Sequence, residues 1–386
     1  MRTAVIVDAV RTPIGRAHDD KGWFRQTRSD DLAVACVRRL LERTRIPPDI
    51  VDDVLFGATQ QTGQQGTNVA RLIGLMAGLP HRVAGVTINR LCGSSLQALH
   101  QAVHAIQSGA EDVQIVGGLE HMGRLPWGDG SELNPRLFHS IARGSLHMGL
   151  TAELLARRYR ISREQQDRFA WQSHQRAARA HSAGEFSSEL ISVTGRDERG
   201  APLLVDRDQC VRPDTTLAAL AALEPVFLPK LGTVTAGNSS PRNDGAAALI
   251  VMSEARAREL HLRPLARVRA TAVIGVEPSL MGIGPVAATE LALRRAGLSL
   301  RDIDLIELNE AFAAQVLACL QLLGLDESRV NVRGGALALG HPLGASGARI
   351  VATLVHLMRD REVRFGLATM CIGLGQGIAT VLERVE

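Results

Sequence analysis

Three short segments of this chain each place one reactive side chain among glycines and other small residues. The reactive side chains are the thiols of Cys92 and Cys371 and the imidazole of His341. Two thiols and a histidine suit acyl transfer to sulfur, in which one thiolate attacks a carbonyl while the other groups move protons. The three segments are residues 89–95 (NRLCGSS), 340–344 (GHPLG) and 371–377 (CIGLGQG).

Cys92 stands just before a predicted helix, because residues 96–106 combine good helix formers with apolar residues at helical spacing. The positive end of a helix dipole favours the thiolate, which is the nucleophilic form of cysteine. The neighbouring glycines allow backbone N–H groups to approach a substrate oxygen closely. We therefore expect Cys92 to be the nucleophile.

At these residues the chain resembles the thiolase family, and the resemblance extends along nearly its whole length. It is closest to the degradative 3-ketoacyl-CoA branch, which supplies the β subunit of bacterial fatty-acid oxidation complexes. One CxGSS segment would be weak evidence, but several family motifs in the right order are specific. Besides the three segments above, the matching stretches are residues 5–13 (VIVDAVRTP), 117–122 (GGLEHM), 235–240 (TAGNSS) and 309–313 (NEAFA).

The resemblance implies a ping-pong thiolytic cleavage of a 3-ketoacyl-CoA. Cys92 would attack the 3-keto carbonyl while His341 removes its proton, and Cys371 would protonate the departing acetyl-CoA enolate. The amides of Cys92 and Gly373 would stabilise the tetrahedral oxyanion, and a water held by Asn309 would assist His341 at the enolate oxygen. Coenzyme A is then a co-substrate, and we expect neither a permanently bound cofactor nor a metal ion.

The same resemblance implies four contacts with CoA. His147 and Met148 match a His-Met pair that faces the pantetheine in short-chain thiolases. Arg212 aligns with an arginine near the nucleotide end of CoA, although a solvated loop arginine explains it equally well. Ser240 lies in a loop that touches pantetheine in the family. Because many long-chain relatives lack the histidine, His147 leaves the preferred acyl length open.

One motif departs from the family pattern. Thiolases usually have Asn-x-Asn-Gly-Gly before the histidine motif, whereas residues 331–335 are NVRGG, so Arg333 replaces the second asparagine. If that position supports the active-site loops, its hydrogen bonds must be remade. The three reactive residues are intact, so the resemblance still implies an enzyme, an acetyl-CoA C-acyltransferase.

The composition of the 386-residue chain excludes several other classes of protein. The net charge is +4, but the basic residues are dispersed and aromatic residues make up only 3%, which argues against nucleic-acid binding. The five cysteines form no CxxC pair, which argues against a zinc knuckle or a disulfide framework. Cys36 and Cys319 lie in apolar helical patterns and are predicted to be inert, whereas Cys210 has no assigned role.

The N-terminus leads at once into a predicted strand, and no apolar run reaches transmembrane length. We therefore expect a cytoplasmic protein without a membrane-spanning segment. The resemblance further implies a homodimer, and close relatives form a heterotetramer with a hydratase/dehydrogenase α subunit.

An internal repeat organises the chain, because strands and helices alternate in the first part and again in the last part. Such alternation predicts an α/β protein with largely parallel sheets. The thiolase fold implied by the resemblance has this form: duplicated βαβαβαββ halves in a layered α-β-α-β-α core, with an inserted loop domain. The expected strands are 3–9, 53–57, 84–88, 113–117, 245–252, 265–274, 305–308 and 365–371; the expected helices are 29–43, 68–78, 96–106, 285–296, 311–323 and 347–358.

Three domains are expected from this pattern. Residues 1–120 and 246–264 form the N-terminal domain with Cys92, and residues 265–386 form the C-terminal domain with Asn309, His341 and Cys371. Residues 121–245 repeat nothing and form an inserted domain that in thiolases holds CoA. Its expected parts are a Gly/Pro-rich stretch at 123–130, an amphipathic helix at 148–159, a helix at 164–183 that begins with a capping box, and mostly loop at 192–232.

Three other functions remain open at this point. An acetoacetyl-CoA thiolase would use the same chemistry on a shorter substrate. A decarboxylating ketosynthase shares the fold, but that class typically needs two histidines around its cysteine, and the Cys371 motif favours a thiolase. A non-catalytic acyl-CoA carrier or scaffold would be expected to have lost Cys92 or His341, and both are present.

Overall fold

The computed structural model describes residues 2–125 and 133–385, so part of the Gly/Pro-rich stretch expected at 123–130 lies outside the described residues. The N-terminal half follows the expected alternation of strands and helices, with boundaries close to those predicted. Its elements are β1 (Ala4–Arg11), β2 (Gly15–Arg16), α1 (Ser29–Thr44), β3 (Asp53–Gly57), α2 (Val69–Ala77), β4 (Val86–Ile88), α3 (Ser94–Ser108), β5 (Val113–His121), β8 (Asn243–Ser253) and α7 (Glu254–Glu259).

The C-terminal half repeats this pattern and ends with a strand pair. Its third strand is reduced to a single parallel bridge between Ile306 and Val330. The predicted helix at 347–358 begins four residues earlier, so that His341 lies directly before its first turn. The elements are β9 (Ala266–Gly275), α8 (Gly284–Ala296), β10 (Leu305–Leu308), α9 (Ala313–Leu323), α10 (Ala336–Leu339), α11 (Leu343–Asp360), β11 (Phe365–Ile372) and β12 (Gln376–Arg384).

The strands form one continuous mixed sheet in the order β10-β11-β12-β9-β1-β8-β5-β3-β4, with β2 paired beside β8. The prediction of largely parallel sheets is wrong, because only the β3–β4, β3–β5 and β10–β11 pairs among these are parallel. A short turn returns the chain from β11 to β12, and a short turn permits only an antiparallel pair. The two halves meet where Val5 and Ile6 of β1 pair with Arg267 and Ala266 of β9.

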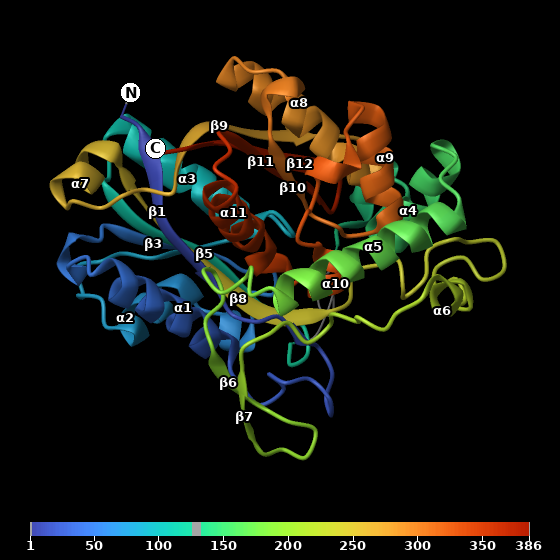
Figure 1. The fold of residues 1–386 in the computed structure, drawn as a ribbon, viewed down its shortest axis with the longest axis horizontal. Coiled ribbons are helices and arrows are strands. Elements are labelled where there is room, and N and C mark those ends of the chain that lie inside the picture. Colours follow the sequence, from blue (N-terminus) through green and yellow to red (C-terminus); the bar gives the residue numbers. More distant parts are fainter. Residues whose placement is uncertain (1, 126–132, 386) are drawn as a thin grey trace.

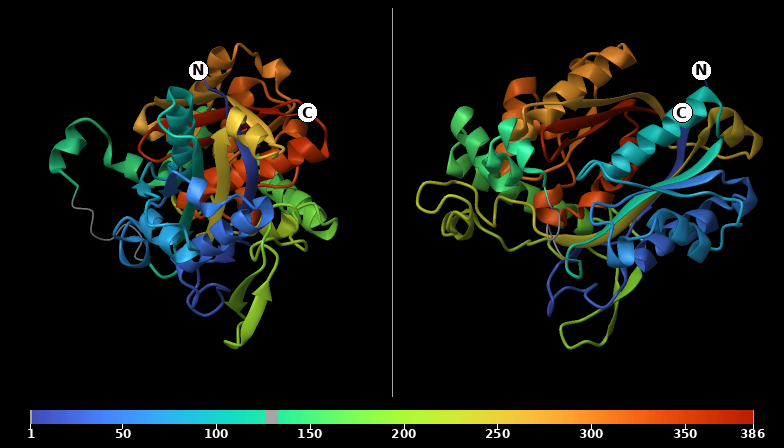
Figure 2. Two further views of the ribbon diagram at one scale, coloured as in Figure 1. Left: turned by 90° about the vertical axis from the view of Figure 1, so that its left-hand side faces the viewer. Right: turned by 180° about the vertical axis from the view of Figure 1, so that it is seen from behind.

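The helices form three layers around this sheet, as Figures 1 and 2 show. Helices α1 and α2 cover the outer face of the N-terminal half, and α8 and α9 cover the outer face of the C-terminal half. Helices α3 and α11 pack against each other and against strands of both halves, where they form the largest apolar cluster. The expected α-β-α-β-α layering is therefore present.

Close approach of the two central helices depends on glycine. A Cβ atom added to Gly347 of α11 would collide with the backbone of Leu96 in α3. A Cβ atom on Gly344 would collide with the carbonyl of Leu119 at the end of β5. No other residue type is small enough to allow these backbones to approach so closely.

The inserted segment contains α4 (Met148–Arg158) and α5 (Arg163–Ser182), and Ser162 and Gln165 form the predicted capping box. The expectation of mostly loop at 192–232 is partly wrong. That region includes a hairpin of β6 (Val193–Arg196) and β7 (Pro202–Val205) and the short helix α6 (Leu217–Ala221), all too short to give a clear periodic signal. Within the described residues, no helix combines the length and apolarity that crossing a bilayer requires.

The central helix contact generates a stability prediction. Gly347→Ala should destabilise the protein by about 1–3 kcal/mol, because the added methyl group must push α11 away from α3. Gly74→Ala in α2 is the matched control, since its Cβ would meet Val54 and Leu79 at ordinary distances of 3.4 and 3.6 Å. The melting temperature measured by calorimetry should fall for the first variant and be unchanged or raised for the second; equal values would contradict the packing argument.

Candidate active site

The two thiols and the imidazole that the sequence singled out line a single cavity of about 150 Å³. Cys92 precedes the first turn of α3, His341 precedes the first turn of α11, and Cys371 lies near the end of β11. The remaining lining is mainly apolar. It consists of Met122, Met148, Ser240, Pro241, Arg242, Met281, Ala311, Phe312, Leu343 and Gly373.

The His341 ring is held in a defined protonation state by its neighbours. The hydroxyl of Ser346 donates to the carbonyl of Pro342 (2.9 Å) and lies 2.6 Å from Nδ1 of His341. Because that hydroxyl hydrogen is already used, Oγ accepts from Nδ1–H, and the lone pair is on Nε2. Burial, aided by the positive charge of Arg349, lowers the pKa of His341 to about 3, so the ring is a neutral base.

Burial keeps the Cys92 thiol protonated at rest, so the helix dipole, which favours the thiolate, does not determine its state. Burial raises its pKa to about 11, against the lowering effect of hydrogen bonds from the amides of Gly373 and of Cys92 itself. The helix dipole changes a pKa only weakly. It cannot offset the rise in the pKa of the Cys92 thiol that follows from the loss of surrounding water. The thiol therefore needs a base to become a nucleophile.

Cys371 is a still weaker acid than Cys92. Burial raises its pKa well above the ordinary value, and the nearby thiols of Cys92 and Cys319 raise it further. The side chain is 2% exposed and lies in the apolar cluster of Met281 and Ala311. A thiol in such a place keeps its proton until a strongly basic atom appears beside it.

Asn309 is positioned at the end of β10 and faces the imidazole. Its amide nitrogen is nearly equidistant from the two ring nitrogens of His341, at 3.4 Å from Nε2 and 3.5 Å from Nδ1. Its Oδ1 accepts from the Arg349 guanidinium at 3.3 Å. The side chain is fully buried, which leaves its orientation fixed by these contacts.

Two buried residues that sequence reasoning did not assign hold the loops around His341. The Glu120 carboxylate accepts from the amides of Thr59 and Gly344, both at 3.0 Å, and so joins the end of β3 to the first turn of α11. Oδ1 of Asn243 accepts from the His341 amide at 2.8 Å. Glu120 belongs to residues 117–122, one of the stretches that resemble the thiolase family. The sequence therefore identified the motif but not the hydrogen bonds that Glu120 makes.

The four residues expected to contact CoA are divided between three places. Met148 and Ser240 line the cavity of the reactive groups. Arg212 lines a second cavity of about 300 Å³, which shares Pro241 with the first. His147 is exposed at the start of α4 and lines neither cavity.

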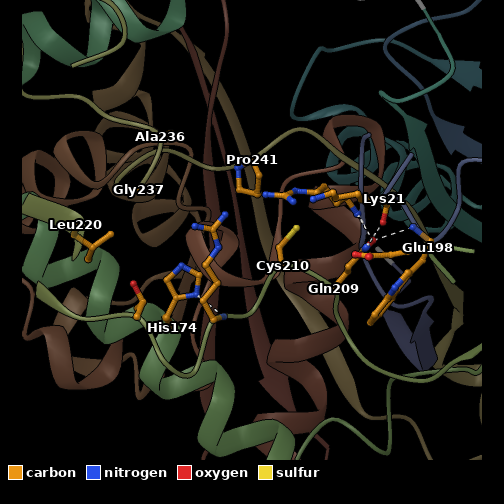
Figure 3. Close-up of a pocket in the computed structure, with 13 residues that line it drawn as sticks. Lys21, His174, Glu198, Gln209, Cys210, Leu220, Ala236, Gly237 and Pro241 are labelled. Carbon is orange, nitrogen blue, oxygen red and sulfur yellow. Dashed lines mark hydrogen bonds between the residues drawn. The ribbon is translucent and has the colours of Figure 1, made fainter. Parts of the chain in front are cut away.

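Figure 3 shows this second cavity, in which Cys210 and Pro241 lie between His174 on one side and Lys21 and Glu198 on the other. Cys210, which had no assigned role, accepts a hydrogen bond from the Asn243 amide at 3.3 Å. The cavity is lined mostly by polar surface and by Arg16, Lys21 and Arg212, so it suits an anionic ligand better than an apolar one.

Arg333 does not reach the reactive groups. Its guanidinium pairs with Glu185 at 2.9 Å and with Asp360 at 2.7 Å, and so ties the loop to the end of α5 and to α11. Asn331 holds the loop instead, since its side chain bonds the backbone N–H and C=O of Leu308 and a carboxylate oxygen of Glu310. The departure from the family motif is thus accommodated by ion pairs outside the cavity.

Comparison with known proteins shows which family the chain is similar to. The thiolase N-terminal domain model matches residues 4–255, and the thiolase C-terminal domain model matches residues 262–384. The chain is 54% identical to a 3-ketoacyl-CoA thiolase of Serratia proteamaculans and 56% identical to one of Pectobacterium carotovorum, each over 389 aligned residues and 100% of both chains.

Solved structures give the same result for the fold. An acetyl-CoA acetyltransferase of Bacillus anthracis superposes with a TM-score of 0.92 at 38% identity, and the human mitochondrial 3-ketoacyl-CoA thiolase with 0.91 at 40%. Both comparisons cover 100% of this chain and 99% of the other.

The raised pKa of Cys92 generates a prediction about pH. The rate at which iodoacetamide alkylates Cys92 should rise about tenfold per pH unit from pH 7 to 10, because only the thiolate reacts. Mass spectrometry of the Cys92 peptide measures the rate. In the unfolded protein, the alkylation rate of the same peptide should stop rising above the ordinary cysteine pKa of about 8.5. A plateau below pH 8 in the folded protein would contradict a buried, protonated thiol.

Proposed function

This chain belongs to the thiolase family, and on that premise we propose that it cleaves 3-ketoacyl-CoA with CoA in fatty-acid β-oxidation. The products are acetyl-CoA and a shortened acyl-CoA, so the enzyme is an acetyl-CoA C-acyltransferase. The single observation that supports this best is the cavity that Cys92, His341 and Cys371 share. Full-length relatives are named for this activity.

The first step is proposed to join Cys92 to the acyl group. Sγ of Cys92 forms a bond to the 3-keto carbon, and the proton of the thiol passes to Nε2 of His341. Because the thiol has a pKa of about 11 and the imidazole one of about 3, proton transfer must accompany attack on the carbonyl rather than precede it. A resting thiolate–imidazolium pair would be strongly disfavoured in this cavity.

The second step breaks the bond between the α and β carbons of the substrate. The electron pair of that bond moves onto acetyl-CoA as its enolate, and the acyl group stays on Cys92 as a thioester. We assign Cys371 as the donor of the proton that the enolate takes up. The raised pKa of Cys371 keeps its thiol protonated until this strong base forms. The amides of Cys92 and Gly373 would stabilise the tetrahedral oxyanion, and Asn309 with His341 the enolate oxygen.

The third step returns the enzyme to its starting state. A free CoA enters, and its thiol loses a proton to the Cys371 thiolate, because His341 still holds the proton that it took from Cys92. The sulfur of CoA then attacks the thioester, and Cys92 leaves with its electron pair and recovers its proton from His341. Atoms and charges balance without any group beyond the two thiols, the imidazole and CoA itself.

CoA is proposed to lie across the two cavities. Its pantetheine arm would contact Met148 and Ser240, and its anionic nucleotide end would lie near Arg212. His147 is proposed to meet the part of the arm that lies outside the cavity. No permanently bound cofactor takes part in this scheme.

The organisation of the protein in the cell is also a proposal. We infer a homodimer in the cytoplasm, and a heterotetramer with a hydratase/dehydrogenase α subunit, from the resemblance to 3-ketoacyl-CoA thiolases of fatty-acid oxidation complexes. The division into residues 1–120 with 246–264, residues 121–245 and residues 265–386 follows the repeat, and residues 121–245 are proposed to hold CoA.

The nucleophile is tested by substitution. Cys92→Ser should lower thiolysis by about 10³-fold or more and abolish the covalent acyl adduct, because a serine hydroxyl is a far weaker acid than a thiol. Mass spectrometry of the intact protein after incubation with 3-ketoacyl-CoA detects the adduct. Cys36→Ala in α1 is the control and should keep both activity and adduct. An unchanged adduct in the serine variant would refute the assignment of Cys92.

An acetoacetyl-CoA thiolase is the second candidate, favoured by the small cavity and the His147–Met148 pair. Steady-state rates with 3-ketoacyl-CoA of increasing length separate the two functions. We expect turnover of 3-ketohexadecanoyl-CoA as well as of short substrates. Fast turnover of acetoacetyl-CoA with no thiolysis of the long substrate would establish the second candidate instead.

A further inference from the structure

We propose that Arg349 is a positioning residue for this reaction: paired with Glu307, it fixes the Asn309 amide so that its nitrogen faces the His341 ring. The proposal rests on the proposed function and adds a task for two buried residues that the chemistry above does not use. It concerns how the catalytic groups are held, and Arg349 itself does not line the cavity.

The geometry around Arg349 leaves its guanidinium directed at two acceptors. One terminal nitrogen lies 3.3 Å from Oε2 of Glu307, and the other lies 3.3 Å from Oδ1 of Asn309. Arg349 and Glu307 each have 1% of their surface exposed. The two ends of an amide have nearly the same shape, so a buried amide is oriented by its partners. A cation at Oδ1 requires Nδ2 to point the other way, toward the ring of His341.

Helix α11 supplies both groups that orient the active-site polar residues. Ser346 and Arg349 are three residues apart and therefore lie on the same side of the helix. Ser346 sets the protonated nitrogen of His341, and Arg349 sets the orientation of Asn309. The two contacts together fix the amide and the imidazole relative to one rigid element.

Stability alone does not explain a buried ion pair at this place. Replacing such a pair with apolar residues is often neutral or stabilising, because the charges lose their water on folding. This pair is also incompletely satisfied, since Nε of Arg349 and Oε1 of Glu307 have no hydrogen-bond partner among the described residues. An imperfect pair that is aligned with Asn309 fits a role in positioning better than a role in folding.

The charged groups near the His341 ring and the Arg349 guanidinium determine what removal of the pair would do. Cys92, which precedes α3, and Cys371 from β11 line the cavity with His341 as neutral thiols, and Arg242 lines it as a cation. Around Arg349 lie Glu307, Arg11, Glu189 and Glu310. Burial raises the pKa of Glu307 to about 8, so its carboxyl is mostly protonated at neutral pH and accepts from Arg349 as a neutral group. Arg349 contributes to the lowered pKa of His341, after burial. Loss of this cation therefore raises the pKa of His341, and the base is protonated at a higher pH.

The experiment uses the double variant Arg349→Met with Glu307→Gln, which removes the guanidinium and the carboxyl together, so that neither group is left without its partner. We expect kcat for thiolysis to fall about 10-fold to 100-fold with KM for CoA unchanged, as for a lost transition-state contact. The acid limb of kcat/KM should move upward by about one pH unit. Arg333→Met, which removes another buried guanidinium that pairs away from the cavity, should change neither quantity.

A second arm tests whether Arg349 acts through Asn309. In the Asn309→Ala background the double variant should cause no further loss of kcat, because the amide that Arg349 orients is absent. A full additional loss would overturn the proposal, and so would unchanged kcat and pH profile in the double variant. Glu307→Gln alone, checked by circular dichroism, serves if the double variant does not fold, and should show a smaller loss in the same direction.

A third arm keeps this inference separate from the proposed function. The titration of the His341 ring, followed by NMR, needs no CoA substrate and is compared between the wild type and the double variant. A pKa of His341 that is higher in the variant supports the role of Arg349, whereas identical titrations oppose it. Absence of thiolysis in the wild type would refute the proposed function. The comparison of the wild type with the double variant could still be interpreted, because it does not depend on thiolysis.

Discussion

The contact between α3 and α11 is the constraint on which the rest of the structure depends. Both helices are central, both are covered by sheet on two sides, and glycines allow their backbones to approach without intervening side chains. Their first turns lie beside Cys92 and His341, so any change in the helix contact moves the Cys92 thiol relative to the His341 ring. The carboxylate of Glu120 strengthens this arrangement, because it binds the first turn of α11 to the end of β3.

Much of this architecture could be predicted from the pattern of residues. The helix at 29–43 and the strand at 53–57 appear almost as expected, since each has a clear pattern of apolar residues. The three reactive segments were identified from the sequence, although the distances between their side chains could not be. Strand direction was misjudged because β12 was not among the expected strands, and because β8 follows a long inserted segment that does not reveal its direction.

The sequence could not reveal the electrostatic state of the cavity. A cysteine before a helix indicates a thiolate when only the dipole is considered, but the deciding quantity is the amount of water removed from the sulfur. That quantity depends on side chains from distant segments, such as Met148 and Phe312. Partners such as Arg349 for Asn309 are likewise set by the packing of α11, forty residues further along the chain. Local motifs identify reactive groups, whereas tertiary burial determines which of them are protonated.

The complete burial of α11 has a consequence for synthesis on the ribosome. Its residues from Leu343 to Met358 have no solvent-facing side, and they cover the inner face of a sheet whose N-terminal strands are made much earlier. About 235 residues separate the end of α3 from the start of α11, which at 5–20 residues per second corresponds to roughly 10–50 s of translation. During that interval the nascent N-terminal half exposes an apolar surface that only the last quarter of the chain can cover. Transiently exposed apolar surface favours aggregation, so the risk of misassociation during synthesis is concentrated on this face.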